Sequence, residues 1–220
     1  RDEFDKLLTL PQPTAGLWFA IDTGLADEFI PELSGLRLEQ DPIHRHKDVL
    51  THTIAVVENV RRDAHPSFDF RRTRLAAFYH DIGKPKTRSY RKGKGVSFHH
   101  HEVVGAKMTR KRMQALRFPN EQIDDVARLV ELHLRFHGYG TGEWTDAAVR
   151  RYVRDAGDQL AQLHKLTRAD CTTRNRKRAA TLQRAYDSLE VRIDELAQQE
   201  ALDAIRPDLD GAQIMAMLDI

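Results

Sequence analysis

The sequence has a single cysteine and no long apolar run. Cys171 alone cannot form an intramolecular disulfide, which points to a reducing compartment. No apolar stretch reaches the length of a membrane span, and the first residues lack the charged-then-apolar pattern of a signal peptide. We therefore expect a cytoplasmic protein without a membrane partner. Residue 1 is arginine rather than methionine, so we interpret the chain as a piece of a longer protein.

Alternation of apolar and polar residues with a period of two is also scarce, and the sequence has no internal repeat or low-complexity segment. Apolar residues recur instead every three or four positions, which predicts an all-α fold, a helical bundle. Of the 220 residues, 40% are apolar, enough to form a core. We expect helices at about 48–62, 72–82, 101–116, 120–135, 145–155, 158–170 and 175–202.

Proline and glycine mark the segments between these helices. They break residues 1–40 into short helical pieces, which are typical of a connecting segment. Residues 86–98 are rich in Lys, Arg and Gly and predict a mobile basic loop. At the far end, residues 207–211 predict a turn, and a short helix is expected over 212–218.

Charge is distributed unevenly along the chain although the net charge is only +2. Residues 84–112 carry ten Lys or Arg against one Glu, whereas residues 187–219 carry nine Asp or Glu against two Arg. A dense basic field favours phosphate-bearing partners. A solvated helix face followed by a flexible loop explains the same pattern equally well.

The pair His80-Asp81 stands in the motif HDIGK, at the end of an apolar helix that Gly83 and Pro85 are expected to stop. Imidazole and carboxylate are ligands for divalent metals, and adjacent residues can reach one ion where a helix unwinds. For the pair alone, a capped helix end with a histidine bonded to the aspartate is the more ordinary interpretation.

Further residues of metal-ligand type recur on the apolar faces of other helices. His52 follows Val49 by three positions, and His133 follows Val130 by three. Asp170 comes four positions after an apolar leucine, and burying an unpaired carboxylate there would cost free energy. His101 is the first residue of the helix that follows the basic loop. Each of these residues, taken alone, is explained as a hydrogen-bonded core residue or a helix cap. Because five helices each carry a residue of metal-ligand type, we infer a shared site.

The order His52, His80-Asp81, His101, His133 and Asp170 resembles the metal-binding pattern of the HD phosphohydrolase superfamily. The resemblance implies that one ion is held by His52, His80, Asp81 and Asp170, and a second by Asp81, His101 and His133. Two such ions would clamp a phosphate and activate water for attack on phosphorus. It also implies catalytic roles for Asp81 and for Lys84, which would neutralise phosphate charge.

Some of these assignments have alternatives among the remaining histidines. In the run His99-His100-His101, His101 is preferred because HHEVVGA resembles the family pattern, and His100 is the fallback. His137 and His46 are weaker candidates for the surroundings of the site. The metal is open among Fe, Mn, Co, Ni, Zn and Mg, with one or two ions per chain.

A closer resemblance covers nearly the whole chain. The opening RDEFDKLLTLPQPTAGLWFAIDTGL and the blocks FYHDIGKPKTR, LVELHLRFHGY, LTRADCTTRN and RPDLDGAQIMAMLDI are similar to bacterial, actinobacterial-type CCA-adding tRNA nucleotidyltransferases, relatives of poly(A) polymerases. The family's N-terminal nucleotidyltransferase head, a Gly-rich loop followed by paired aspartates, is absent from this sequence. The resemblance implies a neck and body segment at 1–42, an HD metal-binding domain at 43–172 and a C-terminal helical tail at 173–220.

Three functions are consistent with these patterns. The first is a metal-dependent phosphohydrolase acting on nucleotides or RNA ends. The second is a tRNA-binding scaffold with a structural or vestigial metal site, for which the family suggests contacts from Arg110, Lys111, Arg112, Arg174, Arg176, Lys177 and Arg178. The third is a signalling-nucleotide hydrolase unrelated to tRNA. Metal content and turnover distinguish the phosphohydrolase from the tRNA-binding scaffold. Salt-dependent binding of tRNA distinguishes both from the signalling-nucleotide hydrolase.

Overall fold

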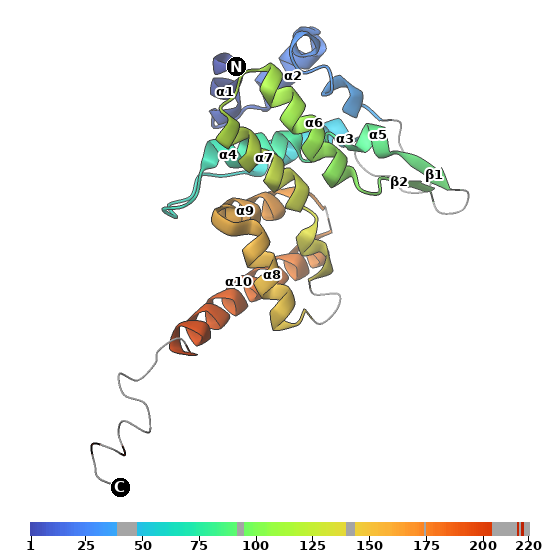
Figure 1. The fold of residues 1–220 in the computed structure, drawn as a ribbon. Coiled ribbons are helices and arrows are strands. Elements are labelled where there is room, and N and C mark those ends of the chain that lie inside the picture. The colour runs from blue at the N-terminus through green and yellow to red at the C-terminus, as the bar shows by residue number, and fades with distance from the viewer. Residues whose placement is uncertain are drawn as a thin grey trace.

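The computed structural model describes residues 1–38, 48–91, 95–139, 144–173 and 175–203, together with 215 and 217. Almost all of the regular structure in these ranges is helical (Figure 1), which confirms the all-α class. The helices are α1 (Asp2–Thr9), α2 (Thr14–Asp22), α3 (Val49–Asn59), α4 (Phe70–Tyr79), α5 (Lys84–Thr87), α6 (His101–Ala115), α7 (Asn120–Leu132), α8 (Asp146–Ala156), α9 (Leu160–Asp170) and α10 (Arg176–Asp203).

The first 38 residues form short helices that pack on the rest of the bundle. Two 3₁₀ turns, Leu25–Glu28 and Ser34–Leu36, follow α1 and α2. The Phe4 ring meets the Phe78 ring of α4 edge to face, with ring centroids 5.0 Å apart. The buried residues of this segment belong to the same hydrophobic core as those of α3, α4, α6, α7, α8, α9 and α10.

Arg74 joins this N-terminal segment to the bundle. Its side chain lies on α4 and is only 1% exposed. The guanidinium donates hydrogen bonds to the backbone carbonyls of Leu8, Leu10 and Val60. Because a buried cation is costly unless acceptors surround it, these three carbonyls hold α1, α3 and α4 in one arrangement.

The central helices α3, α4, α6, α7 and α9 position the candidate site. Aspartates begin two of them as N-caps, since Asp48 accepts from the N–H of Thr51 and Asp69 accepts from the N–H of Arg72. α4 contacts α3, α7 and α9, and α6 contacts α7 along its length. α4 therefore lies at the centre of the bundle, and its last turn opens toward the helices that carry the other candidate ligands.

The basic segment 86–98 differs from the expected loop. The helical turn α5 leads into a two-stranded antiparallel hairpin, β1 (Ser89–Arg91) and β2 (Gly95–Ser97), in which Tyr90 pairs with Val96. The hairpin extends from the bundle beside α5 (Figure 1). Each strand has three residues, too few for a recognisable alternating pattern, and this is why the sequence pattern did not reveal it.

The long C-terminal helix packs within its own chain around its middle. α10 contacts α8 and α9, where Tyr186 and Leu189 are buried and the Tyr186 hydroxyl donates to the carbonyl of Thr167. Val191 is 56% exposed, and the far end of α10 projects beyond the bundle (Figure 1). Other apolar side chains in the middle of α10, which include Ile193 and Leu196, are covered by their own chain.

Several sequence-based expectations fall outside the described residues. They are the turn at 207–211, nearly all of the short helix at 212–218, and the positions of His44, His46 and Arg174. Among the helices that are described, none has the length and apolarity to span a membrane.

Candidate metal centre

The centre is built around the turn that follows α4. α4 ends at Tyr79, His80 and Asp81 come next, and α5 begins at Lys84. Gly83 lets this turn approach the start of α6 closely: a Cβ placed there would lie 2.2 Å from the carbonyl oxygen of His101. The absence of a side chain at Gly83 thus brings α6 and its first histidine against the His80-Asp81 pair.

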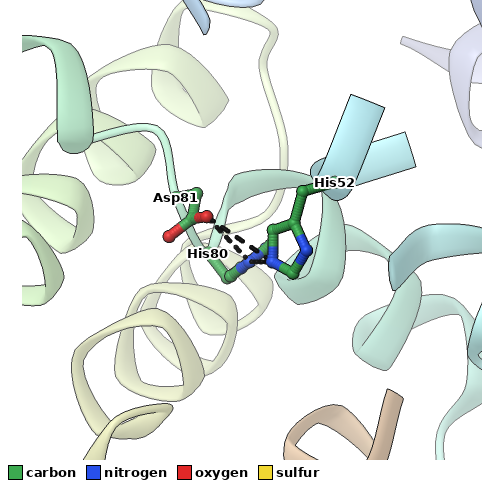
Figure 2. Close-up of side chains that lie close together, drawn as sticks. All are labelled: His52, His80 and Asp81. Atoms are coloured by element: carbon green, nitrogen blue, oxygen red, sulfur yellow. Dashed lines mark hydrogen bonds and ion pairs between the residues drawn. The ribbon is translucent and has the colours of Figure 1, made fainter. Parts of the chain in front are cut away.

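His52, His80 and Asp81 form a first group of potential ligands (Figure 2). Nε2 of His80 lies 3.3 Å from Nε2 of His52 and 3.2 Å from Oδ2 of Asp81. Asp170, at the end of α9, joins this group because its Oδ1 lies 2.9 Å from Nε2 of His52 and 3.7 Å from Nε2 of His80. Residues from α3, α9 and the turn after α4 thus converge on one point.

Asp81, His101 and His133 form a second group, whose ligand atoms all lie within 4.8 Å of one another. Oδ1 of Asp81 lies 3.3 Å from Nε2 of His101, whereas Oδ2 faces His52 and His80. The imidazole of His133 lies between the two groups, with ring centroids 5.4 Å from that of His80 and 5.3 Å from that of His101. The two oxygens of Asp81 therefore divide between the groups, the arrangement expected of a bridging carboxylate.

Three of the four histidines are oriented by the same backbone contact. Nδ1 of His80, His101 and His133 lies 2.7, 2.8 and 2.6 Å from the carbonyl oxygen three residues earlier in the chain. A carbonyl can only accept, so Nδ1 carries the proton and Nε2 keeps its lone pair. This fixed tautomer, with Nε2 directed inward, is the one that a metal-ligating histidine needs.

The donor set fits a divalent metal ion. Nε2 of His101 is buried and has no hydrogen-bond partner of good geometry, although Asp81 is nearby. An unpaired buried nitrogen is costly in a folded protein unless something binds it. Mixed imidazole and carboxylate ligands suit Zn, Fe, Mn, Co or Ni, so a cation would satisfy the atom that the protein leaves unpaired.

The pKa values of the buried groups reflect their close packing. Burial would lower the pKa of His80, but the charges of Asp81 and Asp170 outweigh it and raise that pKa. Burial would likewise raise the pKa of Asp81, but His80, Lys84 and His101 hold it well below its usual range. For His133, burial lowers the pKa to about 3, so its imidazole stays neutral at physiological pH. Burial would also raise the pKa of Asp170, but His52 and His80 lower it. The carboxylates of Asp81 and Asp170 are therefore both ionised, as metal ligands must be.

The centre is closed on one side and open on the other. His80 and Asp81 are 1% exposed, whereas the side chains of His52 and Asp170 are each 18% exposed. Lys84, 21% exposed, also lies at this edge, and its Nζ is 2.6 Å from Oδ2 of Asp81. A ligand would approach the centre past these three side chains.

The other candidate residues lie in varied places. The side chain of His100 is 83% exposed, so the structure brings His101, and not His100, to the centre. Arg112 binds both carboxylate oxygens of Glu32, each at 2.8 Å, and thereby ties α6 to the N-terminal segment. Arg110 pairs with Asp124 on α7. Lys111 and the α10 residues Arg176, Lys177 and Arg178 are exposed.

Sequence reasoning missed one residue of the centre. The hydroxyl of Thr172 lies 3.0 Å from Nδ1 of His52 and gives this histidine the partner that a carbonyl gives the other three. Thr172 stands two positions after Asp170, beyond the end of α9, so no helical periodicity marks it. Its contact spans 120 residues of sequence and exists only in the folded chain.

Comparison with known proteins agrees with this geometry. The model of the HD domain family matches residues 49–175. An A-adding tRNA nucleotidyltransferase from Deinococcus radiodurans is 31% identical over the whole chain and 49% of its own length, and a CC-adding tRNA nucleotidyltransferase from Thermus thermophilus is 33% identical over the whole chain and 48% of its own length. The chain thus spans about half the length of these curated relatives. This chain belongs to the HD domain family and is similar over all of its 220 residues to bacterial tRNA nucleotidyltransferases.

Proposed function

We propose that this chain is a divalent-metal-dependent phosphohydrolase that acts on phosphate esters of nucleotides or RNA ends. The observation that carries the proposal is the convergence of four histidines and two aspartates in which Asp81 directs one oxygen to each of two ligand groups. The second supporting observation is the shared orientation of the histidines, which leaves Nε2 free to bind a cation.

Each residue has a distinct role in this proposal. His52, His80, Asp81 and Asp170 would hold one ion, and Asp81, His101 and His133 a second. When bound, such ions would polarise a phosphate ester and make water a better nucleophile. Lys84 would exchange its contact with Asp81 for one with the phosphate, because both are anionic and it lies at the open edge of the centre.

The relatives suggest the context in which this activity operates. Both are named tRNA nucleotidyltransferases, and this chain corresponds to about half of each. We propose that the full-length protein is a cytoplasmic tRNA nucleotidyltransferase whose catalytic head lies outside this chain. In that protein the HD centre would act on the phosphates of tRNA or of damaged RNA ends.

The test combines elemental analysis with turnover. The purified chain is assayed on bis-p-nitrophenyl phosphate and on a 2′,3′-cyclic nucleotide with added Mn, Co, Ni, Zn or Mg. Bound metal and metal-dependent hydrolysis are expected, with His101→Ala losing activity and the adjacent, exposed His100→Ala retaining it. Absence of both bound metal and turnover with every ion would contradict the proposal.

The second candidate function is a tRNA-binding scaffold. Exposed Lys111 and the basic start of α10 favour it, since surface lysine and arginine bind phosphate without needing turnover. In that case tRNA binding should persist in His80→Ala and weaken steeply with salt. Under the phosphohydrolase proposal, His80→Ala instead removes hydrolysis while circular dichroism shows the helices intact.

A further inference from the structure

A polar cavity lies between the end of α3 and α9, and its lining includes Ala169 and Cys171, which flank the candidate ligand Asp170 in the chain. Its volume is about 430 Å³, within the range of sites that bind small molecules. Four cationic side chains line it, Arg61, Arg62, Lys165 and Arg168, against the single carboxylate of Asp63. We refer to it as the α3–α9 cavity. Its lining carries an excess of three positive charges, the composition expected of a site for anions.

The cations of this cavity differ in how far they are already paired. Lys165 pairs with Asp63, and Arg168 pairs with Asp187 and Glu190 of α10.

Arg61 donates a hydrogen bond to the backbone carbonyl of Glu58, but its contact with a carboxylate oxygen of that residue is long, at 3.9 Å. The guanidinium of Arg62 lies 4.4 Å over the ring of Phe70, and no carboxylate among the described residues pairs with it. Arg61 and Arg62 are exposed side chains that can therefore bind an incoming anion.

Contacts between α3 and α9 relate the position of the cavity to that of the metal centre. His52 contacts Asp170 at the metal centre, and seven residues further along α3 the side-chain amide of Asn59 donates to the carbonyl of Ala169, at 3.0 Å. Ala169, which lines the cavity together with Asn59, directly precedes the candidate ligand Asp170. Seven helical residues span roughly 10 Å, so the end of α3 that lines the cavity lies about this far from His52.

The candidate ligands carried by the two helices that border the cavity are also the partly exposed ones. His52 and Asp170, the candidate ligands that belong to α3 and α9, are the two that are 18% exposed, while His80 and Asp81 are buried. A substrate whose phosphate reaches the metal centre therefore has the α3–α9 cavity beside it.

We propose that the α3–α9 cavity binds a second phosphate of the substrate, roughly 10 Å from the phosphate that is hydrolysed. Arg61 and Arg62 supply the contacts, because guanidinium groups bind phosphate oxygens with two parallel hydrogen bonds. The inference rests on the proposed function and narrows its substrate class to molecules with at least two phosphates. An oligonucleotide end and a free polyphosphorylated nucleotide share this chemistry.

The test compares the double variant Arg61→Gln/Arg62→Gln with the control Arg151→Gln/Arg154→Gln. The control removes the same charge from exposed positions of α8 that do not line the cavity. Turnover is measured on bis-p-nitrophenyl phosphate, which has one phosphate, and on a pentaribonucleotide with a 2′,3′-cyclic phosphate end. The cavity variant should lose about tenfold in kcat/KM on the pentaribonucleotide and nothing on the small ester. The control should change neither.

Direct binding separates this inference from the proposed function. A fluorescein-labelled oligodeoxynucleotide is titrated onto the chain without turnover, with tripolyphosphate as competitor. Binding that the cavity variant weakens and the control does not supports the site even if no hydrolysis is found. Strong competition by tripolyphosphate identifies a free polyphosphorylated compound as the ligand, and weak competition identifies the oligonucleotide.

The inference is overturned if the two double variants bind and hydrolyse the pentaribonucleotide equally well, or if the cavity variant loses activity on both substrates alike. Arg61 and Arg62 are exposed, and glutamine retains part of the stem that covers Phe70, so the fold should persist. Arg61→Gln alone provides a milder variant whose smaller effect must have the same substrate preference.

Discussion

Replacing Gly83 by alanine should damage the second ligand group while leaving the first in place. The new Cβ would lie 2.2 Å from the carbonyl oxygen of His101, 2.7 Å from the nitrogen of Gly105 and 3.1 Å from its Cα. All three are backbone atoms of α6, so no side chain can turn away to make room. Since normal contacts are about 3.5 Å, α6 must move by about 1 Å relative to Asp81.

This displacement has two measurable consequences. Overpacking of this kind costs about 1 to 3 kcal/mol of unfolding free energy. It also moves Nε2 of His101 away from Asp81 Oδ1, now 3.3 Å apart, and a misplacement of this size costs about 100-fold in catalytic rate. His52, His80 and Asp170 are not on α6, so the first group should keep its metal affinity.

The assay is metal stoichiometry by elemental analysis, together with kcat/KM on bis-p-nitrophenyl phosphate and urea unfolding. Gly35→Ala is the matched control, because a Cβ at that position meets nothing within 4 Å. A Gly83→Ala protein that keeps full metal content, with kcat/KM close to that of Gly35→Ala, would refute the reasoning.

Four other outcomes are expected. Asp81→Asn should abolish turnover on every ester, because a neutral amide cannot bridge two ions; full activity would exclude the bridging role. Thr172→Val should reduce metal affinity about 10-fold to 100-fold in a dialysis titration, because it frees the His52 ring. Turnover should fall as pH drops from 8 to 5, because a proton on His80 competes with the metal ion for Nε2. Asp81 and Asp170 raise the pKa of His80, and burial offsets this only in part; a flat pH profile would contradict this prediction. Arg74→Met should lower the free energy of unfolding by roughly 3 kcal/mol in urea, because it leaves buried carbonyls unpaired.

Local patterns predicted the helices of this protein well. Spacings of three and four residues oriented His52, His133 and Asp170 toward the interior. Gly83 and Pro85 predicted a helix end at residue 82, whereas α4 already ends at Tyr79. These features depend on residues close in sequence, where the geometry of a helix decides which side chains share a face. The all-α class followed from the same patterns.

Features that depend on distant segments could not be predicted in this way. The contact of Thr172 with His52 joins residues 120 positions apart, and the α3–α9 cavity is lined by two segments that are about 100 positions apart in the chain. Arg112 belongs to a dense basic run that suggested nucleic-acid contacts, yet it binds Glu32, 80 residues away. Charge density along the sequence does not reveal which cations have partners in the folded chain. The roles of the basic residues in RNA binding and the domain boundaries at 42 and 172 stay predictions.

The buried position of Arg74 bears on how such proteins can be recombined. The HD family match begins at residue 49, but the carbonyls of Leu8 and Leu10 that accept from Arg74 lie 40 residues earlier. In a chimera joined at the start of the family match, Arg74 would be buried without these two acceptors. The N-terminal helix of the new partner would have to place two backbone carbonyls at the same positions. The unit that can be moved between proteins without loss of these hydrogen bonds therefore includes α1 and is longer than the family match at residues 49–175.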